Sequence, residues 1–80
     1  MPTILRLLGF RFHFYSNEGM EPAHIHVASA EGECKFWLDP VMLASSRGLS
    51  AVDIRKIEGL VYEHRDFLRE RYHEFHRHDD

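Results

Sequence analysis

Phe10-Arg11-Phe12-His13-Phe14-Tyr15 decides the fold, because a phenylalanine alternates there with a polar or amphipathic residue. A period of two residues is typical of a β-strand with one buried face. The alternation returns over residues 24–28 and 34–38, and Leu8-Gly9 predicts a tight turn after an earlier strand at residues 4–7. These segments predict a three- to four-stranded antiparallel meander with short connections.

The second half of the chain predicts one long helix. Ser50 and Asp53 resemble a capping box, in which side chains bond the free backbone amides of a helix start. His64 lies near the centre of the apolar stripe that follows, where a histidine is most often a core residue with satisfied ring nitrogens. The stripe has helical spacing and consists of Ile54, Ile57, Leu60, Val61, Phe67, Leu68 and Phe75.

The pattern between sheet and helix is ambiguous. Asp39-Pro40 can begin a short helical segment that ends at Gly48, and an irregular edge strand is the alternative. A chain of 80 residues has room for one domain. We therefore predict a single α+β domain over residues 1–80. Its sheet spans about 3–39, a connecting segment spans 40–49, and a helix at about 50–76 packs on one sheet face.

The alternation also assigns side chains to the two faces of the sheet. The face toward the helix is expected to hold Phe10, Phe12, Phe14, Ile25, Val27, Phe36 and Leu38. The opposite face is then cationic and rich in histidine: it holds His24 and His26 together with the predicted binding residues Arg11, His13, Tyr15, Lys35 and Trp37, and Arg6 is a further candidate for it. Such a face can bind an anion or single-stranded nucleic acid through charge and stacking. An ordinary solvated face is the alternative.

His24-Ile25-His26 is the sharpest local motif. Two histidines at positions i and i+2 of a strand point to the same side, about 6.5–7 Å apart. They can converge on one metal ion, with His13 or Glu21 as a third ligand. The alternatives are a catalytic role for His24 and His26 or simple hydrogen bonding to the backbone. We expect no cofactor, and a divalent metal such as zinc is the alternative that this pair leaves open.

Charge and cysteine content narrow the function classes. A formal net charge of -3 argues against a strong, generic nucleic-acid binder, which normally carries a basic excess. Cys34 is the only cysteine, which excludes an intrachain disulfide and fits a reducing compartment. The sequence has no apolar run near the ~20 residues of a membrane span and no signal-peptide pattern at its start. We therefore expect a cytoplasmic protein without membrane contact.

Two longer motifs carry a family resemblance. Glu21-Pro22-Ala23-His24-Ile25-His26-Val27 and Lys35-Phe36-Trp37-Leu38-Asp39-Pro40-Val41 resemble a bacterial family named domain of unknown function four-one-six-zero. Its members also begin like Met1-Pro2-Thr3 and carry a segment similar to Phe14 to Gly19. The helix start at Gly48-Leu49-Ser50 and the pair Glu63-His64 match as well. The chain departs from the family at Tyr72-His73-Glu74-Phe75, where an aromatic-rich close is usual.

The resemblance implies a small prokaryotic protein, often encoded beside another small protein. We therefore expect a binding or accessory component of a toxin–antitoxin-like two-gene module that acts through the His24/His26 face. Its partner would be the small protein encoded nearby or a second copy, and RNA is a further candidate. The alternative is an enzyme, either a nuclease-type toxin or a metal-dependent hydrolase. In the nuclease, His24 or His26 would act as general acid or base, and Arg11 or Lys35 would stabilise charge.

Overall fold

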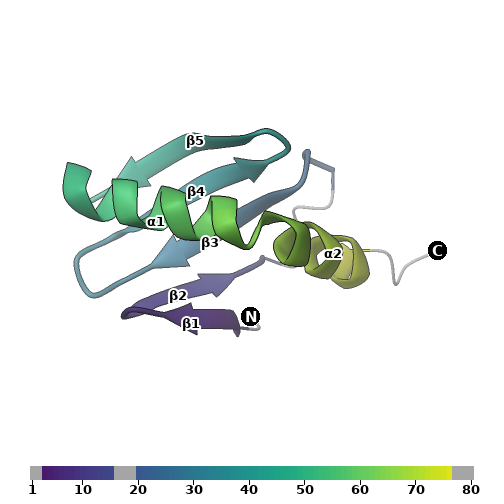
Figure 1. Cartoon of the computed structure of the whole chain (residues 1–80), viewed down its shortest axis with the longest axis horizontal. Coiled ribbons are helices and arrows are strands. Elements are labelled where there is room, and N and C mark those ends of the chain that lie inside the picture. Colours follow the sequence, from purple (N-terminus) through teal and green to yellow (C-terminus); the bar gives the residue numbers. More distant parts are fainter. Residues whose placement is uncertain (1–2, 16–19, 77–80) are drawn as a thin grey trace.

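The computed structural model describes residues 3–15 and 20–76, which form one antiparallel sheet and two helices. The sheet order follows the chain, β1-β2-β3-β4-β5, so each strand pairs with its sequence neighbours (Figure 1). The strands are β1 (Thr3–Leu7), β2 (Phe10–His13), β3 (His24–Ala28), β4 (Glu33–Leu38) and β5 (Val41–Arg47), and the helices are α1 (Ala51–Glu63) and α2 (Arg65–His76). The predicted α+β class is thus confirmed.

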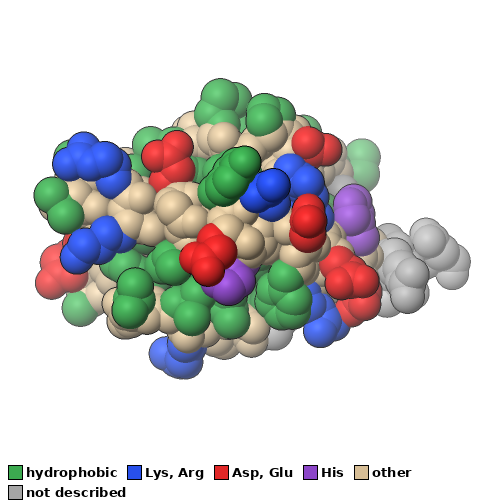
Figure 2. Space-filling view, viewed as in Figure 1, with side chains coloured by type: hydrophobic (Ala, Val, Ile, Leu, Met, Phe, Trp, Pro, Cys, Tyr) green, Lys and Arg blue, Asp and Glu red, His purple; other side chains and the backbone are tan. Residues whose placement is uncertain are grey.

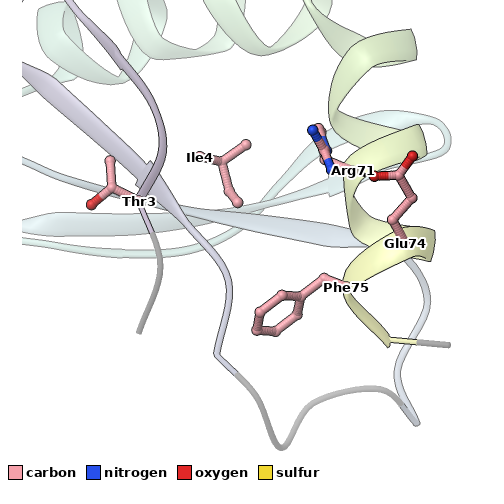
Figure 3. A pocket seen from close by; sticks show the side chains of 5 residues that line it. All are labelled: Thr3, Ile4, Arg71, Glu74 and Phe75. Atoms are coloured by element: carbon pink, nitrogen blue, oxygen red, sulfur yellow. Dashed lines mark hydrogen bonds and ion pairs between the residues drawn. The ribbon is translucent and has the colours of Figure 1, made fainter. Parts of the chain in front are cut away.

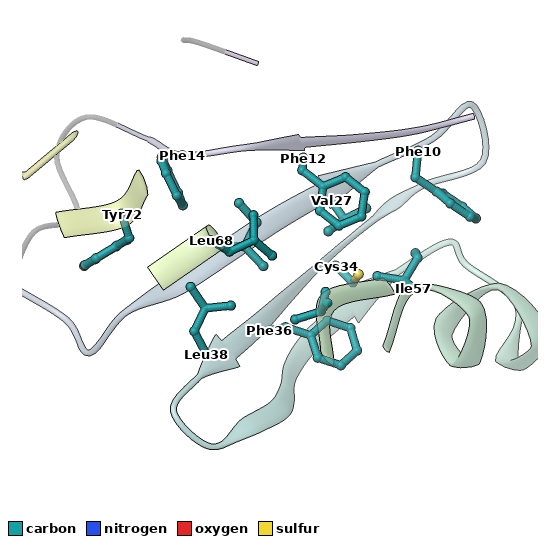
Figure 4. Packing of buried hydrophobic residues seen from close by; sticks show 12 residues of the cluster. Phe10, Phe12, Phe14, Val27, Cys34, Phe36, Leu38, Ile57, Leu68 and Tyr72 are labelled. Atoms are coloured by element: carbon teal, nitrogen blue, oxygen red, sulfur yellow. The ribbon is translucent and has the colours of Figure 1, made fainter. Parts of the chain in front are cut away.

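Both helices pack on the same face of the sheet, which we call the core face. Four side chains of the helices are buried against it: Ile57, Val61, Leu68 and Tyr72. Their partners on the strands are Phe10, Phe12, Phe14, Ile25, Val27, Cys34, Phe36 and Leu38 (Figure 4). The face assignment from the alternation is therefore confirmed for all seven expected residues. In the helices, Phe67 was expected in the core but is exposed, and the buried Tyr72 was not expected.

The predicted connecting segment at 40–49 is wrong and the alternative of an irregular edge strand is confirmed, because residues 41–47 form the edge strand β5. Asp39 and Pro40 do not begin a helix; they are joined by a cis peptide bond in the turn between β4 and β5. A register shift hides the strand from a pattern search. Leu43 pairs with Phe36 and Ser45 pairs with Lys35, so the intervening residue is an extra one that breaks the alternation. The sheet therefore has five strands instead of three or four.

The single long helix expected over 50–76 is also wrong, because the helical path breaks at His64. This residue has φ -104° and ψ 17°, which ends α1, and Arg65 begins α2. The guanidinium of Arg65 donates a hydrogen bond of 2.7 Å to the backbone carbonyl of Tyr62 near the break. The α1 helix packs on β4 and β5, whereas α2 packs on β3 and β4. A break lets the two helices follow different strands of a sheet that twists.

Local signals at the element ends agree with the sequence. Leu8 and Gly9 have positive φ values of 52° and 84° and form the two-residue hairpin turn between β1 and β2. The Ser50 hydroxyl accepts a hydrogen bond from the backbone amide of Asp53 at 3.1 Å, as an N-cap does. The loop that the sequence predicts at Ser16–Pro22 lies partly outside the described residues. None of the described helices has the length and apolar composition of a membrane span.

The outer side of the helix layer has no large region of one charge sign. In Figure 2, acidic and basic side chains are interspersed over the helices. Arg71 and Glu74 of α2 form an ion pair, and so do Arg69 and Asp66. Exposed pairs of this kind contribute little to stability and leave no charged patch for a polyanion. The helix side is therefore a poorer candidate for a charged binding site than the opposite face of the sheet.

Candidate functional site

The sheet face opposite the helices, which we call the open face, carries three rows of side chains that cross the strands. Strand pairing defines each row, because directly paired residues point to the same side. The arginine row is Arg6, Arg11, Ala28, Glu33 and Arg47; the histidine row is His13, His26, Lys35 and Ser45; the tryptophan row is His24, Trp37 and Met42. Strand pairing thus places on this face six of the seven residues that the alternation assigned to it, all except Tyr15.

Tyr15 joins the same group from just beyond the end of β2. Its ring centroid lies 4.4 Å from that of His26 and 5.1 Å from that of His13, in both cases nearly edge-on. His26 also stacks on His13 at 5.7 Å and meets His24 at 5.3 Å. His26 is therefore the centre of an aromatic cluster and keeps part of its surface exposed.

His24 is the more deeply placed member of the His24/His26 pair. Its side chain is 1% exposed, and its Nδ1 donates a hydrogen bond of 2.9 Å to the backbone carbonyl of Pro22. Its ring also contacts those of Trp37 at 5.9 Å and Tyr72 at 5.5 Å. These contacts orient the ring and cover it, so His24 supports the site while His26 faces the solvent.

His13 is buried, and neither of its ring nitrogens meets hydrogen-bond criteria with any residue in the ranges 3–15 and 20–76. Burial lowers the pKa of His13 below its ordinary value of 6.5, and the positive charge of Arg11 and the neighbouring His26 lower it further. The ring is therefore neutral at pH 7. A neutral buried ring stacked on His26 gives that residue a firm apolar support.

Lys35 is fixed between an acid and an aromatic ring. Its Nζ donates a hydrogen bond of 2.5 Å to Oε1 of Glu21 and lies 4.7 Å from the ring centroid of Trp37. The same Glu21 oxygen is 3.9 Å from Nδ1 of His24. His13 and Glu21, the two alternatives expected for a third metal ligand, therefore both lie close to the histidine pair. Within residues 3–15 and 20–76, however, no three His, Cys, Asp or Glu side chains are arranged as a metal site.

The open face is hollowed beside His26. This His26 pocket has a volume of about 260 Å³ and is lined by Tyr15, His26, Glu33, Cys34, Lys35, Ser45, Ser46 and Arg47. The lining includes a histidine, an amine and the hydroxyl groups of Tyr15 and Ser45, whereas Ser46 pairs with the core residue Cys34 and has the parity of the core face. Arg47 pairs with Glu33 at 2.9 Å. Burial and, to a lesser extent, Glu33 raise the pKa of Cys34 to about 11, so its thiol is a poor nucleophile at neutral pH. The pocket suits an oxyanion better than a thiol reaction.

Sequence reasoning missed Ser45, Ser46 and Arg47, because all three come from the strand that was expected to be a connection. The apolar run Val41-Met42-Leu43 directly after the Asp39-Pro40 turn is the signal that could have found it. His64 of the helical stripe does not join the histidine pair. The residue lies in the helix layer, on the opposite side of the sheet from His26.

A larger hollow lies between β1 and α2, on the helix side of the sheet. It has a volume of about 480 Å³ and is lined by Thr3, Ile4, Arg71, Glu74 and Phe75 (Figure 3). Its two charged side chains, Arg71 and Glu74, pair with each other. An internally neutral ion pair among apolar groups offers no general base or anion site, so the His26 pocket is the better candidate despite its smaller size.

Comparison with known proteins places the chain in a family. Neither a curated protein nor a solved structure matches it. A family model described as Domain of unknown function (DUF4160) matches residues 9–73. This range contains strands β2 to β5, helix α1 and the whole His26 pocket. Because the match covers well over half of the 80 residues, the chain belongs to the DUF4160 family.

Proposed function

We propose that this chain is the binding component of a toxin–antitoxin-like two-gene module and that its open face contacts a small partner protein. The observation that carries the proposal is the one-sided covering of the sheet. Both helices pack on the core face, whereas the open face holds the half-buried side chains of His26, Lys35 and Trp37. Tryptophan, tyrosine and arginine dominate the binding energy at protein interfaces, and the open face carries Trp37 and Arg11.

Size gives a second reason to expect a partner. A chain of 80 residues buries only about 60–65% of its unfolded surface, so its core contributes little spare stability. Met42 in the tryptophan row is more than half exposed, next to Trp37. A partner that covered this row would remove apolar surface from water and stabilise the fold.

The test is binding to the small protein encoded beside the gene. We expect the purified pair to form a complex by size-exclusion chromatography and calorimetry. The variant His26→Ala/Trp37→Ala should bind at least about tenfold more weakly, because a central tryptophan often contributes 2 kcal/mol or more. The control Arg55→Ala/Glu58→Ala changes two exposed side chains of α1 and should bind like the natural chain. If the pair fails to associate and the chain alone is a stable monomer, the proposal is wrong.

The His26 pocket supports a second candidate, a nuclease-type toxin that cleaves RNA without a metal. His26 can move a proton, Lys35 can stabilise a developing negative charge, and Tyr15 and Ser45 bring hydroxyl groups to the same hollow. The variant His26→Ala should then abolish RNA cleavage and growth inhibition while its circular dichroism spectrum stays native. Cleavage that persists in this variant would exclude His26 as the acid or base.

A metal-dependent hydrolase is the other form of this candidate, and His24 and His26 would be its ligands. Elemental analysis by mass spectrometry should then find about one metal ion per untagged chain. The variant His24→Ala/His26→Ala should lose that metal. A chain that keeps its metal after both replacements would rule out the site at this pair.

A further inference from the structure

Two arginines of the open face lie opposite each other without a counter-charge. Arg6 of β1 pairs directly with Arg11 of β2 in the sheet register. Like charges at directly opposed positions destabilise an antiparallel sheet. Neither guanidinium makes an ion pair or a hydrogen bond to any residue in the ranges 3–15 and 20–76. This arrangement costs free energy in the isolated chain and would be relieved by a bound anion.

The surroundings of the two arginines leave room for such an anion. A hollow of about 240 Å³ lies beside them and is lined otherwise by small residues: Gly9, Ala28, Ser29 and Ala30. Ala28 is the direct neighbour of Arg11 in the arginine row, on the next strand. Its methyl group occupies the position at which a longer side chain would cover the guanidinium. The volume corresponds to about eight water molecules at ~30 Å³ each, which is ample for a phosphate group.

Of the two carboxylates near this corner, Glu33 is paired with an arginine, whereas Glu31 is bonded to a neutral hydroxyl group and keeps its charge beside the two arginines. Glu33 follows Ala28 in the arginine row, but its Oε2 accepts a hydrogen bond of 2.9 Å from Arg47. Glu31 lies in the turn that borders the hollow, and its Oε1 accepts a 3.5 Å hydrogen bond from the hydroxyl of Ser29. Although the chain is acidic overall, this corner of the open face therefore has a local excess of positive charge.

We propose that Arg6 and Arg11 form a phosphate-binding site. Guanidinium groups bind phosphate oxygens in pairs of parallel hydrogen bonds, which a lysine cannot do, and two of them can hold one phosphate group from two sides. The phosphate belongs either to a free ion or small metabolite or to the backbone of a single-stranded nucleic acid. This site lies on the arginine row, separate from the His26 pocket, and it does not depend on the proposed protein partner.

The experiment is a pair of NMR titrations on the full chain at 50 mM NaCl. One uses inorganic phosphate, and the other uses a short single-stranded RNA. We expect saturable shifts of the Arg6 and Arg11 Nε–H signals and of the Ala28 amide. The variant Arg6→Gln/Arg11→Gln should weaken binding by about tenfold or more, as the loss of two charge-assisted contacts predicts. The control Arg55→Gln/Lys56→Gln removes the same charge from the exposed side of α1 and should leave the affinity unchanged.

Each outcome decides the proposal. Saturation by both ligands, or by inorganic phosphate alone, assigns a site for a free phosphate group, and saturation by RNA alone assigns a backbone site. The absence of a saturable shift with either ligand would overturn the proposal. An equal loss of affinity in the control variant would also overturn it, because the anion would then be attracted by the overall charge of the protein and not by this site. The single variant Arg11→Gln repeats the test if the double variant unfolds. The affinity of Arg6→Gln/Arg11→Gln for the partner protein separates this site from the proposed function. Partner affinity should fall only if the two arginines also belong to the protein interface.

Discussion

At the scale of single residues, the burial of His13 shows the free-energy cost of the aromatic cluster around His26. Its ring is 1% exposed, and in the described part of the chain neither nitrogen meets hydrogen-bond criteria with a partner. Burying a polar group without a partner costs about 1–3 kcal/mol in typical proteins. The ring nevertheless lies between Tyr15 and His26 and supports both by aromatic contact. Burial of the His13 ring thus lowers the stability of the fold but holds the His26 ring in a fixed position.

The first prediction concerns the pH dependence that His13 introduces. Its folded-state pKa is lowered from 6.5 by burial, so below about pH 6.5 the unfolded chain binds more protons at this residue than the folded protein does. Stability should be fully present above pH 6.5 and should fall as the pH drops toward the folded-state pKa. The variant His13→Phe removes the titrating group and keeps a ring of similar size. Its free energy of unfolding in urea should lie within about 1 kcal/mol of the natural chain at pH 7.5 and exceed it at pH 5.

A matched control separates this histidine from the others. His73 lies exposed on α2, and His73→Gln should keep the pH dependence of the natural chain. If His13→Phe loses as much stability between pH 7.5 and pH 5 as the natural chain does, another group dominates the acid sensitivity.

At the scale of elements, two glycines let two segments of the backbone approach closely. A Cβ added at Gly32, before β4, would lie 2.0 Å from the backbone oxygen of Arg47 at the end of β5. A Cβ at Gly48 would lie 2.4 Å from the backbone oxygen of Glu31, and Gly48 has a φ of +83° that L side chains rarely adopt. The β3–β4 turn and the end of β5 are therefore in backbone contact.

The second prediction follows from this contact. Gly32→Ala should lower the free energy of unfolding by about 1–3 kcal/mol or more, because the atoms that the new Cβ would meet belong to the backbone of Arg47 and Gly48 and cannot rotate away. In thermal unfolding, this corresponds to roughly 4–8 °C for each kcal/mol in a domain of this size. Gly59→Ala is the matched control: no atom lies within 4 Å of its Cβ position on α1, so it should stabilise by about 0.5–1 kcal/mol. A Gly32→Ala variant as stable as the natural chain would contradict the close approach.

Sequence reasoning succeeded for elements whose side chains repeat a simple period. Alternation placed β1 to β4 and the core face, because one buried face imposes a period of two on each strand. It failed at β5, where the extra residue between Leu43 and Ser45 interrupts that period. It also failed at His64, because no proline or glycine marks the break between the helices. The helices follow different strands, and that choice depends on tertiary packing rather than on local propensity.

At the scale of the whole molecule, the candidate site depends on strand pairing that the sequence does not contain. Alternation correctly put His13, His26 and Lys35 on one face, but only the register shows that they form one row with Ser45. The different burial of His24 and His26 could not be predicted either. Residues 24 and 26 are two positions apart in one strand and so lie on the same face, but the ring of Tyr72 from α2 contacts the ring of His24 at 5.5 Å and helps to bury it.

The last prediction tests how α2 holds this end of the molecule together. The hydroxyl of Tyr72 donates a hydrogen bond of 3.1 Å to the backbone carbonyl of Glu21, 51 residues earlier in the chain. Glu21 in turn bonds Lys35, so α2 is linked through one residue to the open face. Tyr72→Phe should lower the free energy of unfolding by about 0.5–1.5 kcal/mol and shift the ring signals of His24 in NMR spectra. Tyr62→Phe makes the same change at a side chain that is 58% exposed on α1 and should alter neither quantity. Faster amide hydrogen exchange confined to α2 in Tyr72→Phe would show that the bond stabilises this helix locally. Unchanged exchange, stability and His24 signals would show that α2 is held by its apolar contacts alone.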